Sequence, residues 1–223
     1  MNRVGRMLVL VLCSAFGLML LRALQVMPEN EGLTAAVALE MESSGVSHGV
    51  TAVLLNFRGY DTFFEIGVLL LALVSVWYLG ESSPGPAEHL GSMKVFYLQL
   101  AGPGLVMFAG FLLWIGSRAP GGAFQGGAIL AALGVLMQLS GIPLKGKRNG
   151  MKFRAFLAVG LFVFFVAVFG FLISGASLLE YPREMAGGWI LAIEGACLVS
   201  IGLGLSELFR GQAPDGVDRR EAE

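Results

Sequence analysis

The stretch RAPGGAFQGGAILAALGVLMQ, from Arg118 to Gln138, decides how this chain folds. It opens with a charge and a proline, places four glycines within seven residues, and continues as an apolar run. Because glycine has no Cβ, such a cluster lets the backbone bend sharply or approach a neighbouring helix closely. The stretch therefore predicts the bent, crowded beginning of a membrane helix. The residues of this glycine motif are Pro120, Gly121, Gly122, Phe124, Gln125, Gly126 and Gly127.

Glycines before a helix can instead form an anion cradle, but the neighbouring residues disfavour phosphate binding here. A P-loop carries a Lys-Ser or Lys-Thr pair after its last glycine, and this chain has Ala128 and Ile129 there. A dinucleotide fingerprint follows a β-strand in a soluble unit, whereas apolar helical segments flank this motif. Close helix packing is the other interpretation, since Gly122 and Gly126 have the small-xxx-small spacing of membrane helices.

The composition predicts an all-α, polytopic membrane protein. Of the 223 residues, 56% are hydrophobic and 14% are charged, and the mean hydropathy is +0.75. Globular proteins carry about 25% charged residues. The net charge of −1 gives no general attraction to nucleic acid.

The sequence contains no recognisable catalytic or metal-binding pattern. Cys13 and Cys197 lie in apolar stretches, and His48 and His89 lack metal-ligand spacing. No catalytic triad, HExxH or CxxC motif occurs. We therefore expect no catalytic residue, no metal and no cofactor, and we do not expect the chain to be an enzyme by itself.

We expect about six transmembrane helices, because six apolar segments approach or exceed the roughly 20 residues needed to cross a bilayer. Their ranges are 7–27, 61–79, 94–117, 121–139, 152–175 and 187–209. The first segment lacks the short apolar region and A-x-A site of a cleaved signal peptide. Gly102-Pro103-Gly104 predicts a kink in the third. The apolar piece Val50 to Phe57 is too short to cross, so we expect it to pack or to lie on the surface.

The window ESSPGPAEHLG, from Glu81 to Gly91, is the clearest internal boundary. Its prolines, glycines and serines predict a flexible linker. It separates a two-helix element, residues 1–80, from a four-helix domain, residues 92–210. Residues 211–223 form a polar tail that we expect to be disordered.

Basic residues predict the orientation, because cytoplasmic loops carry an excess of Lys and Arg. With six spans and both termini cytoplasmic, eleven basic residues fall inside and three fall outside. The inner residues are Arg3, Arg6, Lys94, Lys145, Lys147, Arg148, Lys152, Arg154, Arg210, Arg219 and Arg220. The outer residues are Arg58, Arg118 and Arg183, and Arg22 lies inside the first span.

Four charged side chains at membrane depth are candidates for an ion or proton path. Asp61 and Glu65 share one helix face, with Arg58 at the helix entry. Glu194 lies about 10 Å inside the last span, where a carboxyl needs water or a polar partner. Structural roles remain open, because Thr62-x-x-Glu65 also fits a capping box and Glu194 can form an interhelical hydrogen bond.

Two segments resemble one family of transporters. PGGAFQGGAILAA, Pro120 to Ala132, resembles the PGGGFQGG signature of the B subunit of Mrp-type multisubunit Na+/H+ antiporters, with Ala123 in place of the third glycine. TAVLLNFRGYDTFFEIGVLLLA, Thr51 to Ala72, resembles a segment near the end of the large A subunit, typically VILVDFRGFDTLGEITVL. Asn56 replaces an acidic residue there. The same element is a separate small subunit in related membrane-bound hydrogenases, so the chain is similar to that element fused to a B-type domain.

The family pattern includes only some of the candidate site residues. Arg58, Asp61 and Glu65 match the family pattern residue by residue, whereas Glu194 has no motif to match and depends on its depth alone.

The resemblance implies a membrane subunit of a multisubunit monovalent cation/proton antiporter in a bacterial or archaeal cell membrane. Its expected partners are complex I-like proton-channel subunits, small membrane subunits and the lipid bilayer, with Na+ and H+ as the transported ions and no nucleic acid. It would contribute to the ion path or to assembly. Two alternatives remain: an ion-translocating subunit of a hydrogenase-type redox-driven pump, and a purely structural membrane scaffold.

Overall fold

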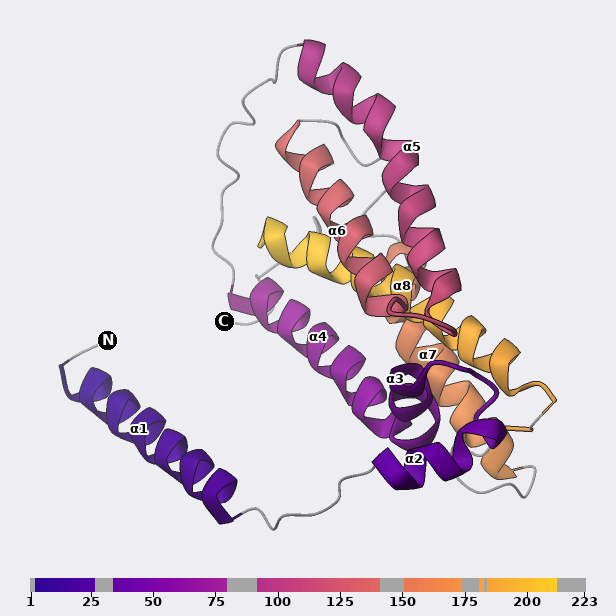
Figure 1. Cartoon of the computed structure of the whole chain (residues 1–223). Helices are drawn as coiled ribbons and strands as arrows, with labels where there is room; N and C mark the ends of the chain where they lie inside the picture. Colours follow the sequence, from indigo (N-terminus) through magenta and orange to yellow (C-terminus); the bar gives the residue numbers. More distant parts are fainter. Residues whose placement is uncertain are drawn as a thin grey trace. The chain divides into compact units, whose positions relative to one another are not determined.

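The computed structural model describes residues 3–26, 34–79, 92–140, 151–173, 181–182 and 184–211 (Figure 1). These residues are helical apart from short connections, and no β-strand occurs among them, so the all-α prediction is confirmed. The chain divides into two compact units, Met1–Ala36 and Val37–Glu223, each described by itself.

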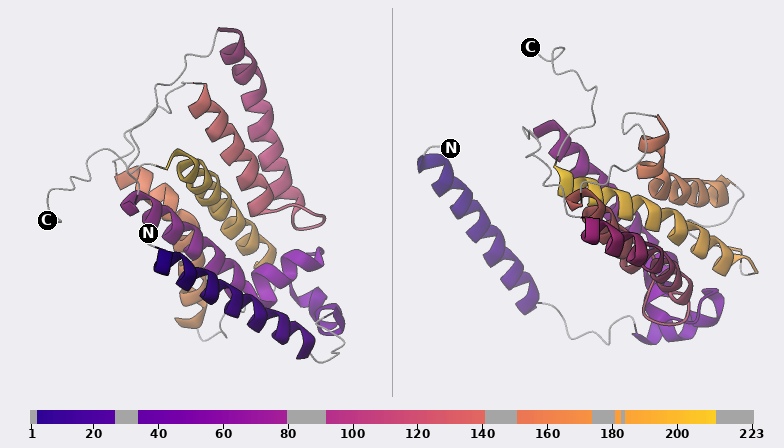
Figure 2. Two further views of the ribbon diagram at one scale, coloured as in Figure 1. Left: turned by 90° about the vertical axis from the view of Figure 1, so that its left-hand side faces the viewer. Right: turned by 90° about the horizontal axis from the view of Figure 1, so that it is seen from above.

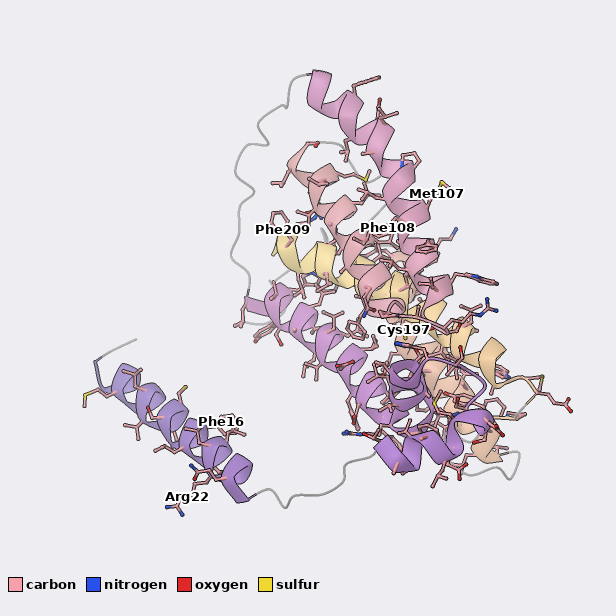
Figure 3. All side chains as sticks on the ribbon, in the orientation of Figure 1. Phe16, Arg22, Met107, Phe108, Cys197 and Phe209 are labelled. Carbon is pink, nitrogen blue, oxygen red and sulfur yellow. The ribbon has the colours of Figure 1, made fainter. Side chains whose placement is uncertain are left out.

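The first unit contains α1, Arg3–Val26. Its apolar part, Leu10–Arg22, carries exposed side chains such as Phe16, at 59% exposure (Figure 3). A helix with so much exposed apolar surface is typical of contact with lipid or with another membrane protein.

Four short elements precede the longer helices of the second unit, and the first of them, α2, begins in the first unit. They are α2 (Thr34–Glu40), the 3-10 helix η1 (Met41–Ser43), α3 (Gly49–Ala52) and the π-helix η2 (Val53–Phe57). Thr51, Ala52 and Leu55 are buried, so the short apolar piece at 50–57 packs against the protein. The backbone amides of Ser47 and His48 both donate to the Ser117 carbonyl at 3.0 Å, which holds this segment against the turn after α5.

Among the described residues of the second unit, five long helices follow, and α8 contacts each of the other four (Figures 1 and 2). They are α4 (Gly59–Leu79), α5 (Ser92–Ile115), α6 (Ala123–Leu139), α7 (Met151–Ile173) and α8 (Ala186–Arg210). Ile193, Cys197 and Ile201 of α8 are fully buried, whereas Met107 of α5 is 76% exposed (Figure 3). The core therefore lies along α8.

Four described helices are long and apolar enough to cross a membrane: α4, Leu98–Ile115 of α5, α7 and α8. The chain is therefore a multi-pass membrane protein. The other two predicted spans are shorter apolar helices, Leu10–Arg22 in α1 and α6 with 17 residues. At 1.5 Å per residue α6 is about 25 Å long, less than the roughly 30 Å of a bilayer core. The count of six remains a prediction.

The structure describes the Gly-Pro-Gly sequence of α5 but not the predicted linker and tail. Helix α5 continues through Pro103, so the Gly-Pro-Gly sequence does not end it. The predicted linker at 81–91 and the tail from residue 212 lie outside the described residues, and the division into domains remains a prediction.

Candidate ion-path site

A glycine turn fixes where α6 begins. The Gly122 backbone amide donates to the Leu112 carbonyl at 2.8 Å, and the Gly122 carbonyl accepts from Gly126 at 3.1 Å. Gly122 has φ 110° and ψ −169°, a conformation that is essentially restricted to glycine. A Cβ at this position would lie 2.7 Å from Glu194 Oε1. The turn therefore leaves room for the Glu194 carboxyl at the start of α6.

Two further glycines of the motif bring α6 close to its neighbours. A Cβ on Gly126 would lie 2.6 Å from Leu198 Cδ1 and 2.8 Å from the Ala109 carbonyl oxygen. A Cβ on Gly127 would lie 2.8 Å from Ile201 Cγ2. Helices α5, α6 and α8 approach closely because these positions carry no side chain.

The other motif residues lie around the turn. Pro120 is exposed, and Phe124 is 38% exposed. Gln125 Oε1 is 3.7 Å from the position that a Gly122 Cβ would take, so the Gln125 amide and the Glu194 carboxyl lie on the same side of Gly122.

Glu194 is a buried carboxyl with one bonded and one unbonded oxygen. It lies about 12 Å along α8 at 1.5 Å per residue and is 5% exposed. The carboxyl accepts a hydrogen bond from the backbone amide of Ala123, the first residue of α6. Oε2 is buried and has no hydrogen-bond partner among the described residues. Buried polar atoms are nearly always bonded, so Oε2 indicates a place for water, a proton or an ion.

Glu194 lies between two cavities of the second unit. The first has a volume of about 690 Å³ and extends from Glu194 to the exposed side chains of Trp114 and Arg118 and to the segment 41–47. The second has a volume of about 210 Å³ and is lined by Glu194, the start of α6 and Glu65 of α4.

A third cavity, of about 680 Å³, continues along α4 and α8 and is lined mainly by apolar side chains. Glu65 and Phe124 line both the second and the third cavity, and Asp61 lines the third. The three cavities therefore follow one another, with Glu194 between the first two and Glu65 between the last two.

Three of the predicted site residues lie at the start of α4. Arg58 Nη2 and Asp61 Oδ2 form an ion pair at 2.7 Å, with side chains 55% and 44% exposed. Glu65 is exposed and follows Asp61 by about one turn. The structure pairs Arg58 with Asp61 and places Asp61 and Glu65 on the third cavity, and Glu65 also shares the second cavity with Glu194.

The capping box that Thr62 and Glu65 could form is not present. Thr62 is already the fourth residue of α4, and its hydroxyl donates to the Leu54 carbonyl at 2.7 Å. The π-helix before α4 explains this, because the Arg58 amide bonds to the Val53 carbonyl at 2.7 Å and leaves the Leu54 carbonyl to the Thr62 hydroxyl. Glu65 is thus not occupied in capping the helix.

These residues and their surroundings match a known family. A family model described as a domain related to the MnhB subunit of Na+/H+ antiporter matches residues 93–209, more than half of the chain. The chain belongs to the MnhB-related family. The matched region contains the glycine turn, α6 and Glu194, so both partners of the Gly122–Glu194 approach lie within the MnhB-related domain.

Solved structures share the fold at low sequence identity. A chain of the membrane-bound sulfane sulfur reductase, an archaeal respiratory membrane complex, is 23% identical with a TM-score of 0.69, covering 93% of this chain and 97% of that chain. A chain of the Mrp complex from Dietzia sp. DQ12-45-1b is 21% identical with a TM-score of 0.63, covering 98% of this chain and 27% of that chain. A search of curated proteins finds no match.

Sequence reasoning missed a second polar cluster at the other end of α8. Glu207 is 1% exposed, and its Oε1 lies 3.6 Å from Arg210 Nε. Nearby on α6, Gln138 Nε2 donates to the carbonyl and hydroxyl oxygens of Ser206, at 2.9 and 2.7 Å. The i,i+3 spacing of Glu207 and Arg210 was the available signal. The residues that the structure describes contain no group of His, Cys, Asp or Glu side chains that could hold a metal ion.

Proposed function

We propose that this chain is a membrane subunit of a multisubunit monovalent cation/proton antiporter and that Glu194 belongs to the ion path. The family is related to a subunit of Na+/H+ antiporters. The solved chains of similar fold belong to multisubunit membrane complexes, so the partners of this chain are other membrane subunits. Na+ and H+ are the ions that the whole complex exchanges.

The observation that carries the site is the position of the Glu194 carboxyl between two cavities, with one oxygen bonded to α6 and the other unbonded. The proposed path leads from the first cavity to Glu194, through the second cavity to Glu65, and on to the third. Asp61 and Arg58 form a charged pair beside the Glu65 end. Acidic groups at membrane depth mark ion paths because they are costly to keep there otherwise.

The remaining parts of the chain fit the same proposal. Residues 1–80 correspond to the two-helix element at the end of the antiporter A subunit, joined through residues 81–91 to the MnhB-related domain. In support, the likeness to the Mrp chain extends over 98% of this chain, well beyond residues 93–209. The protein has six spans with both termini in the cytoplasm of a bacterial or archaeal cell.

Removal of the carboxyl proton site tests the path. Glu194→Gln in the complete complex, assayed in everted membrane vesicles, should reduce the cation-induced change of internal pH by about tenfold or more. Native gels should show normal assembly, because glutamine keeps the size of the side chain and can still accept from the Ala123 amide. Glu184→Gln, at an exposed position before α8, is the matched control and should transport normally. Wild-type transport by Glu194→Gln would remove Glu194 from the path.

The companions of the chain test its place in a complex. We expect a tagged chain purified in mild detergent to retain large proton-channel-like subunits and several small hydrophobic ones, identified by mass spectrometry. Soluble metal-cluster proteins in the same particle would instead favour the redox-driven pump; a chain of the sulfane sulfur reductase, a respiratory complex, shares the fold of this chain. A chain that purified alone would contradict both.

A further inference from the structure

We infer that Glu194 binds and releases protons and does not bind Na+. The inference rests on the proposed function, because it names which of the two exchanged ions reaches this carboxyl.

The polarity of the site favours a carboxylate and disfavours a metal cation beside it. Glu194 accepts from the Ala123 amide at the N-terminus of α6, where the backbone carries partial positive charge. Na+ sites in transporters are built in the opposite way, from unwound backbone carbonyls and the C-terminal ends of helices. A bare cation beside Glu194 would face the Ala123 N–H at this helix N-terminus.

The oxygen atoms that the second cavity could offer Na+ are spread over several elements and mixed with hydrocarbon: beside Glu194 it is lined by Glu65 of α4, Gln125 of α6 and two threonines. Leu54, Leu55 and Phe124 present hydrocarbon to it. Its two threonine hydroxyls are turned toward backbone carbonyls, Thr51 to Gly116 and Thr62 to Leu54. A dehydrated ion that lacks a full set of ligands is too costly to bury.

A proton needs fewer ligand atoms than Na+ does. One unbonded carboxyl oxygen is enough to hold it, and Oε2 is such an atom. At roughly 30 Å³ per molecule, the first cavity has room for on the order of 20 waters and the second for about seven, so water can reach Glu194 from both sides.

The other titratable groups that line the two cavities indicate where a proton from Glu194 would go next. Glu42 and Arg118 line the first cavity, and Glu65 and Cys197 line the second. Behind Cys197, burial raises the pKa of the Tyr181 phenol, so Tyr181 stays neutral. Glu65 is therefore the next carboxyl that a proton leaving Glu194 through the second cavity meets.

A hydrophobic carbodiimide reports which ion occupies the carboxyl. The protonated acid adds across one C=N bond of the reagent, its proton going to nitrogen and its oxygen to carbon, and the product rearranges to a stable N-acylurea. A carboxylate that holds Na+ is protected. In the purified complete complex, Glu194 labelling measured by peptide mass spectrometry should rise as the pH falls. It should not change when Na+ replaces choline at constant pH and ionic strength. Protection by Na+ but not by choline would overturn the inference.

Equilibrium binding of radioactive Na+ to the same complex is the second measurement, and it does not depend on reagent access. The Glu194→Gln complex should bind as many Na+ ions as the wild type, and loss of one ion per complex would overturn the inference. The Glu194→Gln transport assay separates the two failures. Normal transport refutes the proposed path, whereas lost transport together with lost Na+ binding refutes only the choice of the proton.

Discussion

Replacement of Gly122 by alanine should damage both the fold and transport, because the turn imposes two separate constraints. At φ 110° and ψ −169° an L-residue is strained, at a cost of about 1–3 kcal/mol. That free energy corresponds to a change of about 5- to 150-fold in a folding equilibrium. In addition, the new Cβ would lie 2.7 Å from Glu194 Oε1, so the carboxyl would have to move away from α6.

The assay compares heat stability and transport in the complete complex. Purified complex is heated in steps, and the intact fraction is read on native gels, while vesicles report the cation-induced change of internal pH. Gly110→Ala is the matched control, because Gly110 lies on an exposed part of α5 and a Cβ there would meet nothing within 4 Å. Alanine at that position should leave stability unchanged or raise it by up to about 1 kcal/mol.

A double variant separates the two constraints. In Gly122→Ala with Glu194→Asp, the shorter side chain relieves the crowding of the carboxyl but leaves the backbone strain. Transport should recover in part while heat stability stays low. If Gly122→Ala matched Gly110→Ala in both assays, the reasoning about this turn would be refuted.

Four further substitutions test other residues of the second unit. Asp61→Asn and Glu65→Gln should each abolish cation-dependent proton release from vesicles while the complex still assembles; transport that survived both would exclude this face of α4 from the path. Thr62→Val should lower the stability of the complex to heat, by about 1–3 kcal/mol, because it leaves a backbone carbonyl without its donor, and Thr62→Ser should restore it. Gln138→Leu should cost roughly 0.6–1.7 kcal/mol through the lost bonds to Ser206, measured in the same way, and leave transport per assembled complex unchanged.

The long helices could be read from the sequence because length and hydropathy alone determine them. The range 187–209 was predicted for the last span, and α8 covers Ala186–Arg210. Likewise 61–79 was predicted for the span that forms α4, Gly59–Leu79. In a membrane every backbone polar group must be bonded within the segment, so a long apolar run has little choice but to be a helix.

The start of α4 could not be predicted from its own residues, because it depends on the π-helix that precedes it in the chain. Thr62-x-x-Glu65 reads as a capping box only if the helix begins at Thr62. The π-helix at Val53–Phe57 moves the beginning of the helix to Gly59. Sequence patterns do not distinguish a π-turn from an α-turn, since the two differ by one residue in hydrogen-bond spacing.

The contact between the glycine motif and the buried Glu194 carboxyl could not be predicted from the sequence either, since the two lie far apart in the chain. The motif lacks the residues of a phosphate site, yet it forms a helix N-terminus, and the Glu194 carboxyl of α8 accepts a hydrogen bond from the Ala123 amide there. A relay carboxyl must be neither fully bonded nor fully unbonded. Hydrogen bonds to both oxygens would favour the charged form and oppose protonation, and with neither bonded the charged form would be too costly to bury. The Ala123 amide binds one oxygen, Gly122 leaves the space for the carboxyl, and the Glu194 side chain lines two cavities. On the path that we propose, the glycines would matter for transport because they hold Glu194 in a state from which it can both gain and lose a proton.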